Sequence, residues 1–365
     1  MRFSINKVEL QNALGVVMKG ISTRSTLPIL SGVYIDAKVD TVTLQSTDLE
    51  LSVQISVPAL IEEGGKTVVP GKLFSDVIRS LPDAAVHIDV SESDAKITCD
   101  TSTFSLRALN PEDFPGFPSV ATDQSITVPF KVFAGMVKKV SRVVSKDESR
   151  AILTGVLIEL EDSKLRMVAT DSYRLALATS KIEGNTAEDF QAVIAGNFLN
   201  DVCGVINTEA DVTLALSENQ IVITCDQTIF INRRIEGNYP NYRQLLPTDY
   251  NTRATIDLKT LTASVKRAAI LSSSSAPMRF DVNNTTQTLQ IFVNSTEVGS
   301  VQETISCETV GDDVEIAFNS SYVSDGLSVI HGEKIFFDTQ SSMKPGILRT
   351  TDEEEFLYLI MPVRI

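Results

Sequence analysis

The residue types that most often carry catalysis are sparse in this chain, and they form no familiar catalytic pattern. Its 365 residues include two histidines, His87 and His331, and neither lies near a serine or cysteine motif. The segment 65–67 resembles the end of a phosphate-binding loop, but Leu60 stands where that loop needs its first glycine. The acidic run 352–355 is typical of a solvated turn before a strand. We therefore expect no catalytic residue, no metal site and no cofactor.

Positive charge gathers in three short segments, although the formal net charge of the whole chain is −15. Segments 127–146 and 258–271 contain lysine and arginine without any acid, and segment 1–24 is also mainly basic. In segment 127–146 the basic residues recur at helical spacing opposite an apolar face. Such cations bind the phosphates of any DNA sequence through counterion release. From charge alone we expect DNA contacts from Lys131, Lys138, Lys139, Arg142, Lys266 and Arg267.

The composition favours a cytoplasmic protein of more than one domain. Hydrophobic residues make up 43% of the chain, which is enough for sizeable cores. The four cysteines are far apart in sequence and lack the CxxC spacing of redox or zinc sites. The sequence has no apolar run long enough to span a membrane and no secretion signal at its start. We expect reduced thiols, no membrane segment and a cytoplasmic location.

The elements that carry the basic segments recur three times along the chain. Segment 4–14 aligns without gaps with segments 127–137 and 255–265, and each begins a basic helix. A second helix, marked by one buried apolar face, is predicted in each repeat, over 73–81, 198–206 and 322–330. Between the helices apolar and polar residues alternate, which predicts antiparallel strands over 86–90, 96–100, 212–216 and 221–225.

Each repeat is therefore an α+β domain with two helices packed on antiparallel sheets. Proline- and glycine-rich stretches separate the repeats, which gives expected domains at 1–122, 123–250 and 251–365. Three equal units in a row form an arc, and an arc can close into a ring by head-to-tail pairing with a second copy.

The whole chain resembles the bacterial DNA polymerase III beta subunit, or beta sliding clamp, family. The resemblance rests on the order and spacing of segments 26–30, 47–51, 113–115, 169–176, 239–243, 267–271, 318–323 and 361–365. It implies three clamp domains, a head-to-tail homodimer that forms a six-domain ring, and helices that line a pore for double-stranded DNA. It also implies a non-catalytic processivity factor. The implied partners are the polymerase III alpha subunit, the clamp loader, and other polymerases and repair proteins that carry a short clamp-binding peptide.

The resemblance implies a peptide-binding pocket between the second and third domains. Its expected residues are Leu153, Thr170, Ser172, Tyr173, Arg174, Leu175, Pro240, Leu245, Asn319, Tyr322, Leu359, Ile360, Met361, Pro362, Val363 and Arg364. Apolar walls with a few polar groups suit an extended peptide. Ser172 and Tyr173 stand where the family often has glycine followed by histidine, tyrosine or phenylalanine, and Gln244 stands where a basic residue is common. Partner preference is therefore expected to differ at this rim.

The resemblance also implies a ring joint and two further DNA contacts. Arg24 and Arg150 are expected to face DNA. At the joint, Lys72, Phe104 and Leu106 are expected to meet Ile270, Leu271 and Glu303 of the partner subunit. Two alternatives stay open at this point. One is a DNA-binding accessory or regulatory paralogue of the clamp, and the other is an enzyme that reuses the repeat, which would need a metal or acid–base cluster.

Overall fold

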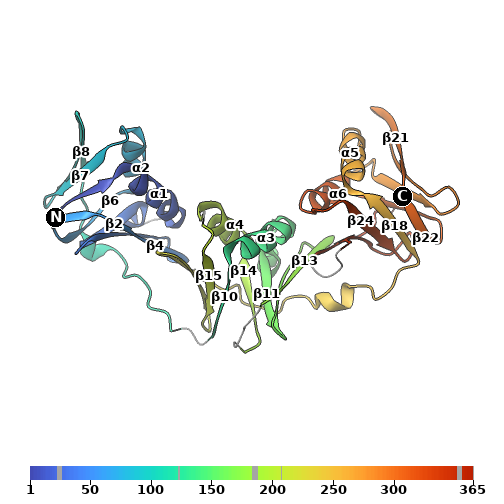
Figure 1. Cartoon of the computed structure of the whole chain (residues 1–365), viewed down its shortest axis with the longest axis horizontal. Coiled ribbons are helices and arrows are strands. Elements are labelled where there is room, and N and C mark those ends of the chain that lie inside the picture. Colours follow the sequence, from blue (N-terminus) through green and yellow to red (C-terminus); the bar gives the residue numbers. More distant parts are fainter. Residues whose placement is uncertain (23–26, 122–123, 183–187, 207, 352–355, 365) are drawn as a thin grey trace. The chain divides into compact units, whose positions relative to one another are not determined.

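The chain folds into α-helices and antiparallel sheets. A computed structural model describes residues 1–22, 27–121, 124–182, 188–206, 208–351 and 356–364. It divides into two compact units, one of Met1–Phe133 with Asp201–Arg234 and one of Ala134–Asn200 with Ile235–Ile365. Strands far apart in sequence pair within each unit (Figure 1). The alternating segments predicted as strands lie in antiparallel pairs, in agreement with the expected α+β class.

The first unit contains a five-stranded sheet, an eight-stranded sheet and the first two helices. The smaller sheet has the order β5 (Leu60–Glu63), β1 (Arg2–Asn6), β7 (Ala85–Val90), β8 (Asp94–Cys99), β9 (Ser102–Arg107). The larger sheet has the order β10 (Gln124–Pro129), β15 (Asp211–Leu216), β16 (Gln220–Cys225), β17 (Thr228–Arg233), β4 (Leu51–Pro58), β3 (Thr41–Thr47), β2 (Gly32–Lys38), β6 (Gly65–Pro70). Helices α1 (Lys7–Val17) and α2 (Gly71–Ser80) pack against each other and on these sheets.

Local sequence explains where these two helices begin and what they bury. The side chain of Asn6 accepts hydrogen bonds from the Val8 and Glu9 amides, which caps α1. Leu10 and Leu14 of α1 are fully buried, as are Phe74 and Ile78 of α2. The apolar residues three and four apart thus supply the core between helix and sheet.

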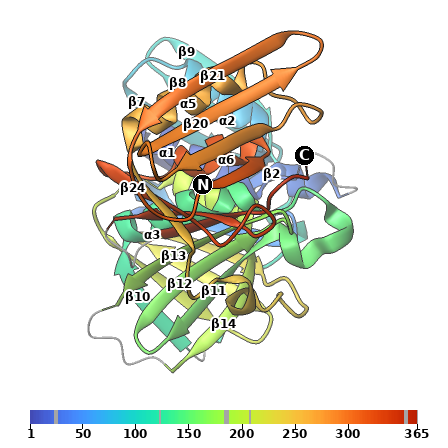
Figure 2. The same cartoon turned by 90° about the vertical axis from the view of Figure 1, so that its right-hand side faces the viewer.

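The second unit contains a nine-stranded and a four-stranded sheet. The larger has the order β14 (Phe190–Ala195), β11 (Gly155–Glu161), β12 (Lys164–Thr170), β13 (Arg174–Lys181), β26 (Phe356–Ile360), β25 (Gly346–Thr350), β24 (Lys334–Thr339), β18 (Thr252–Asp257), β22 (Glu308–Gly311). The smaller has the order β21 (Gly299–Ser306), β20 (Thr288–Ser295), β19 (Met278–Asn283), β23 (Val314–Phe318). Strands β11 to β14 lie side by side in Figure 2. Helices α5 (Leu258–Ala269) and α6 (Ser320–Leu327) pack together.

Two predicted helices are shorter than the sequence pattern suggested. Helix α3 spans Phe130–Val140 and tightens into a 3₁₀ turn at Ser141–Val143, so Arg142 lies on that turn. The helix predicted over 322–330 is α6, and it ends at Leu327. His331 therefore lies beyond the helix rather than at its end. Helix α4 (Gly196–Val205) matches its predicted position. Gly326 of α6 is required by packing, since a Cβ there would come within 2.5 Å of the Tyr358 ring.

Two equivalent strand pairs join successive repeats. In the first unit β17 of the second repeat pairs with β4 of the first, with Phe230 opposite Val53. In the second unit β26 of the third repeat pairs with β13 of the second, with Tyr358 opposite Ala176. The corresponding strands β9 and β21 are each at the edge of a sheet. Among the described residues, one strand of each kind thus has a neighbour on one side only.

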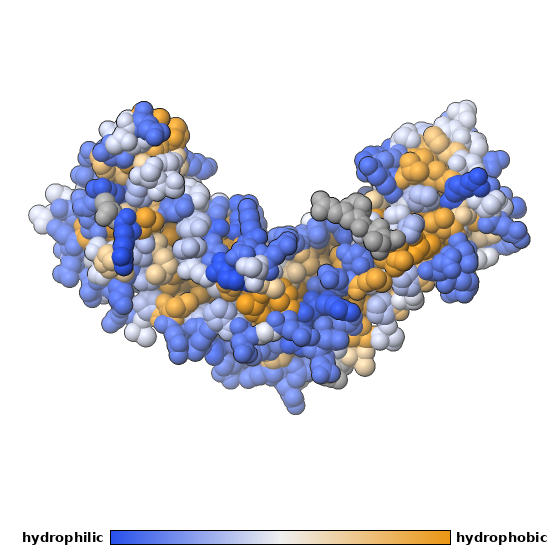
Figure 3. Space-filling view, turned by 180° about the vertical axis from the view of Figure 1, so that it is seen from behind, coloured by the Kyte–Doolittle hydropathy of each residue, from blue (hydrophilic) through white to orange (hydrophobic). Residues whose placement is uncertain are grey.

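The face shown in Figure 3 is mostly hydrophilic with separate apolar patches. Large exposed apolar side chains include Leu73, Phe104 and Ile270, which are 57%, 38% and 78% exposed. Exposed side chains of this size are candidates for contact with another protein. Among the helices that the structure describes, none is long and apolar enough to cross a membrane.

Candidate functional site

Apart from Leu153, which lies on the 3₁₀ segment Glu148–Thr154, the residues predicted for the peptide pocket lie on three segments of the second unit. These are the turn between β12 and β13, the linker 239–246 that follows β17, and the chain around β26 and the start of α6. Leu175 of β13 lies opposite Leu359 of β26. Both belong to a buried apolar cluster made of Leu157, Val168, Leu175, Val193, Tyr242, Ile347 and Leu359. This cluster, the pocket core, holds the three segments together.

The turn between β12 and β13 is fixed by its own side chains. The Asp171 carboxylate accepts hydrogen bonds from the Tyr173 amide at 2.9 Å and the Arg174 amide at 3.0 Å. The Thr170 hydroxyl donates to the Arg174 carbonyl at 2.7 Å and accepts from the Ser172 amide at 3.1 Å. Ser172 has φ of 80°, a backbone conformation in which glycine is favoured. The positive φ also explains why glycine would suit this position, as the resemblance to the family implies.

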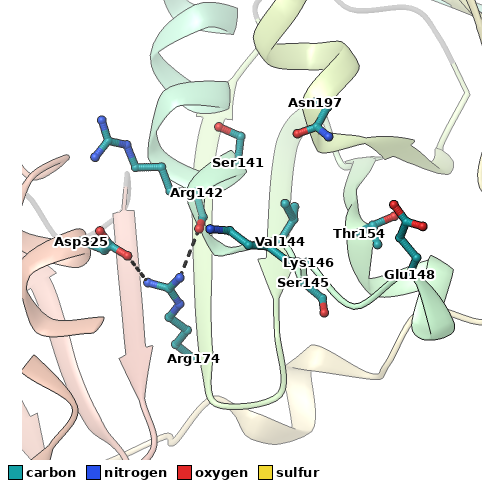
Figure 4. Close-up of a pocket in the computed structure, with 10 residues that line it drawn as sticks. All are labelled: Ser141, Arg142, Val144, Ser145, Lys146, Glu148, Thr154, Arg174, Asn197 and Asp325. Atoms are coloured by element: carbon teal, nitrogen blue, oxygen red, sulfur yellow. Dashed lines mark hydrogen bonds and ion pairs between the residues drawn. The ribbon is translucent and has the colours of Figure 1, made fainter. Parts of the chain in front are cut away.

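Arg174 connects this turn to the third repeat. Its guanidinium donates to the Asp171 carboxylate at 3.0 Å, the Asp325 carboxylate at 2.6 Å and the Tyr358 hydroxyl at 3.2 Å. It also donates to the Arg142 carbonyl at 3.2 Å (Figure 4). Burial acts against its charge, but Tyr358, Asp325 and Asp171 outweigh that effect and raise the pKa of Arg174. The side chain is therefore a permanently charged and almost fully satisfied link.

Aromatic rings form the exposed side of the site. Tyr173 is 60% exposed and stacks on Tyr322 with ring centroids 6.5 Å apart. The Arg174 guanidinium lies 4.4 Å from the centroid of the Tyr322 ring. The side chain of Asn319 caps α6 by accepting from the Ser321 amide at 2.9 Å. The C-terminal segment is anchored beside them, since the Met361 amide donates to the Tyr173 carbonyl at 2.8 Å.

Burial separates the sixteen predicted pocket residues into a floor and a rim. Buried members form the floor, and these are Leu153, Thr170, Arg174, Leu175, Leu359 and Ile360. Asn319, Tyr322 and Pro362 are half-buried. The exposed members, which a ligand can reach, are Ser172, Tyr173, Pro240, Leu245, Met361, Val363 and Arg364. The structure thus brings the turn, the aromatic pair and the C-terminal segment together.

Sequence reasoning missed the groups that anchor the linker. The Tyr242 hydroxyl donates to the Glu159 carboxylate at 2.7 Å, and its ring lies in the pocket core. Burial, and then the Glu159 carboxylate, raises the pKa of Tyr242 to about 12. Arg243 pairs with Glu159 at 2.8 Å and with Glu161 at 2.6 Å. The resemblance at 239–243 marked these residues as notable, but it did not show what they contact.

A polar cavity of about 580 Å³ lies beside Arg174, which forms part of its lining (Figure 4). Its lining combines three cations, two acids, four residues with hydroxyl or amide groups and one valine, namely Ser141, Arg142, Val144, Ser145, Lys146, Glu148, Thr154, Arg174, Asn197 and Asp325. Arg142 is exposed and donates to the Ser328 hydroxyl at 3.3 Å. The predicted DNA contact Arg142 therefore stands at a cavity whose lining carries both cations and acids.

The remaining residues predicted to contact DNA differ in their surroundings. Lys131, Lys138 and Lys266 are exposed. Lys139 is half-buried, with its ammonium nitrogen 5.7 Å from the centroid of the Phe356 ring. Arg267 is held by Glu303, with the closest nitrogen and oxygen 2.6 Å apart. Arg24 lies outside the described residues.

The residues predicted for the ring joint lie on or near edge strands. Phe104 and Leu106 are on β9, and Lys72 is exposed at the start of α2. In the other unit, Glu303 is on β21, and Ile270 and Leu271 directly follow α5. Each unit therefore carries one half of the predicted joint next to an unpaired strand.

The structure offers little for an enzymatic centre. Across the described residues, no group of three or more His, Cys, Asp and Glu side chains could hold a metal ion. All four cysteines are free, with Cys99 and Cys225 buried. Burial raises the pKa of Cys203 to about 12, and burial likewise raises that of Cys307 to about 11. Such thiols are poor nucleophiles.

Comparison with known proteins gives matches across nearly the whole chain. The models that match describe the DNA polymerase III beta subunit: its N-terminal domain at 1–118, its central domain at 127–241 and its C-terminal domain at 243–364. Beta sliding clamps of Staphylococcus epidermidis and Staphylococcus aureus are each 31% identical to it, over 100% of this chain and 99% of theirs. The crystal structure of the DNA polymerase sliding clamp from Bacillus subtilis is 29% identical, with a TM-score of 0.95 over 100% of this chain and 99% of that one. The DNA polymerase III beta chain from Streptococcus pneumoniae is 30% identical, with a TM-score of 0.94 over 100% of both chains.

Proposed function

The chain belongs to the DNA polymerase III beta subunit family, and from that premise we propose that two copies close head to tail into a ring around duplex DNA. The resemblance found in the sequence is thereby confirmed, as is the three-domain α+β clamp fold. The chain is a beta sliding clamp, a non-catalytic processivity factor of DNA polymerase III. The ring, the site residues and the individual partners are the proposed parts.

The observation that carries the ring is the repeated strand pairing between domains. Phe230 opposite Val53 and Tyr358 opposite Ala176 occupy the same position in two equivalent junctions. Phe104 has the place of Phe230 in its own hairpin, because each lies opposite an isoleucine, Ile97 or Ile223. The same register would place Phe104 opposite Val301 of the partner subunit. Two such joints between two copies close six domains into a ring.

We place the domains at 1–122, 123–250 and 251–365. The family models cover 1–118, 127–241 and 243–364, so the C-terminal model begins before residue 251, where we place the third domain. Each domain then contributes two helices, namely α1 and α2, α3 and α4, and α5 and α6. The basic side chains on the first helix of the second and third domains belong to the pore in this proposal.

The pore binds DNA through its phosphates. Lys131, Lys138 and Lys266 are exposed cations, and Arg142 stands at the polar cavity beside Lys146. Arg24, Arg150, Lys139 and Arg267 complete the proposed set. Contacts of this type carry no sequence information, so the ring can slide along any duplex.

The peptide pocket recruits the partners. Its exposed rim of Tyr173, Leu245, Met361 and Val363 stands over the apolar floor, which suits a short apolar peptide. We propose that the polymerase III alpha subunit, the clamp loader and other polymerases and repair proteins use this pocket in the cytoplasm. Tethering then raises the concentration of the polymerase near the primer end.

The test of the proposed ring is retention on DNA of two topologies. The protein is loaded on nicked circular plasmid with a matching clamp loader and ATP, and is gel-filtered before and after the plasmid is linearised. Retention on circles with loss from linear ends supports the ring. Equal retention on both forms would mean that contact alone holds the protein, and the topological proposal would fail.

A further inference from the structure

We infer that Arg243 is a positioning residue of the peptide pocket. Its side chain holds in place the linker that carries Pro240 and Leu245. The inference rests on the proposed function, in which these two residues form one wall of the pocket. Both side chains are exposed, with Leu245 50% exposed. Arg243 lies between them in the 3₁₀ turn Tyr242–Leu245, so a movement of Arg243 moves the wall.

The linker has local backbone bonds and depends on its side chains for its position. The Gln244 amide donates to the Asn241 carbonyl and the Leu246 amide to the Arg243 carbonyl, each at 3.3 Å. The Tyr239 hydroxyl donates to the Val168 carbonyl at 3.2 Å, and the Tyr242 ring is buried in the pocket core. These two tyrosines fix the linker on one side. Leu246 also packs against the pocket core, on the far side of Leu245. Arg243 adds a charged anchor between Tyr242 and Leu246.

Arg243 supplies that anchor through an ionic cluster on the surface of β11 and β12. Its guanidinium pairs with Glu159 at 2.8 Å and Glu161 at 2.6 Å. Arg166 pairs with Glu161 at 2.7 Å and lies 3.6 Å from Glu159. Glu159 is 13% exposed, and it also accepts from the Tyr242 hydroxyl. Two acids and two arginines therefore balance in charge, and Nη2 of Arg243 donates charge-assisted hydrogen bonds to both carboxylates.

The first linker of the chain provides an internal comparison. Segment 113–118 is the counterpart of segment 238–243, and it has Pro118 where the second linker has Arg243. There Phe114 packs on Tyr34 with ring centroids 5.4 Å apart, an apolar anchor at the position of Tyr239. The repeat thus keeps the aromatic anchor in both linkers. The charged anchor occurs in the linker that bears the proposed pocket wall.

The experiment measures binding of a fluorescein-labelled peptide that carries the clamp-binding segment of the cognate polymerase III alpha subunit. Full-length wild-type protein is compared with Arg243→Gln, Arg243→Lys and the control Arg279→Gln, which breaks an exposed ion pair with Glu315. We expect Arg243→Gln to lower the affinity for the peptide about three- to tenfold, the range of a partly exposed ion pair. Arg243→Lys should recover part of the loss, and Arg279→Gln should bind like wild type.

Three further readouts separate positioning from a general loss of stability. High salt should weaken wild-type binding toward the Arg243→Gln value, because screening removes the same ion pairs. Hydrogen exchange in 239–246 should rise in Arg243→Gln and not in Arg279→Gln. Retention on circular DNA should stay unchanged. Wild-type-like binding by Arg243→Gln would overturn this inference alone, whereas failure of the wild type to bind the peptide would overturn the proposed pocket together with it.

Discussion

The Arg150 guanidinium donates to the Ser172 hydroxyl at 3.0 Å, so a residue proposed to contact DNA bonds directly to the rim of the peptide pocket. Arg150 also pairs with Asp147 at 3.2 Å and remains 43% exposed. The bond exists because this chain has serine where glycine is common in the family. Hydrogen bonds from the Ser149 hydroxyl and amide lower the pKa of Asp147, which favours the charged form of this carboxylate.

Arg150→Ala should weaken DNA binding by about the same factor for every sequence. The plot of log affinity against log salt should become shallower by roughly one unit, as expected for the loss of one phosphate contact. Ser172→Gly should leave that slope unchanged, because it removes the partner and not the cation. Fluorescence titrations at several salt concentrations measure both, and an unchanged slope in Arg150→Ala would place Arg150 outside the DNA interface.

Arg174→Met should destabilise the protein by roughly 3 kcal/mol, since it leaves buried partners without their cation. The arginine side chain is 10% exposed, and its partners Asp171, Asp325 and Tyr358 come from both sides of the domain junction. Urea unfolding measures the loss. Arg279→Met, at an exposed pair, should change stability by less than about 0.5 kcal/mol, and a loss of similar size there would refute the special role of Arg174.

Leu49→Gly should stabilise the protein by up to about 1 kcal/mol. Leu49 has φ of 79° and is 54% exposed, so glycine relieves backbone strain and gives up little burial. Leu49→Ala keeps its Cβ and should bring no such gain. Thermal unfolding of both variants decides the point, and equal midpoints would show that the turn is unstrained.

Phe104→Cys combined with Val301→Cys should form a disulfide between subunits under mild oxidation. The expected register places these two positions opposite each other across the joint. Phe104→Cys with Gln302→Cys is the matched control, because neighbouring strand residues point to opposite faces. Non-reducing gels should show a covalent dimer for the first pair and little for the second, and the reverse pattern would shift the joint by one residue.

Glu303→Gln should flatten the loss of stability in acid. The hydrogen bond from Arg267 is the main cause that lowers the pKa of Glu303 below its ordinary value of 4.5 in the folded chain. A carboxyl with a lowered folded pKa contributes stability above its ordinary pKa, and this contribution is lost as pH falls through the folded value. Urea midpoints at about pH 7 and about pH 3 in both proteins test this, and identical acid sensitivity would contradict it.

The sequence was sufficient for the repeat architecture because local periodicity carries it. Apolar spacing located α2 and α4, and alternation located β7, β8, β15 and β16. Helix ends did not follow the apolar spacing as closely: α3 and α6 stop earlier than the pattern, and α3 tightens into the 3₁₀ turn Ser141–Val143. Several pocket residues were identified through family resemblance and not from physical pattern.

The side-chain contacts that anchor the site could not be predicted from the sequence. Arg174 and Asp325 are 151 residues apart, and Arg243 and Glu159 are 84 apart. Nothing in the local pattern of either residue points to its partner, because the topology of the sheet brings them together. Charge alone can also mislead. Arg267 was predicted to contact DNA because it is a cation, but in the structure it pairs with Glu303.

The two internal strand pairings, β4 with β17 and β13 with β26, lie within one polypeptide, whereas β9 and β21 are edge strands that we propose to meet in the partner subunit. In the proposed ring, four of six seams are thus secured by covalent linkers and two are not. A loader that prises the ring apart works against hydrogen bonds and side-chain contacts at those two seams, and the other four stay shut. Entry of DNA is then a hinge movement of whole subunits, and the ring reseals without refolding any domain.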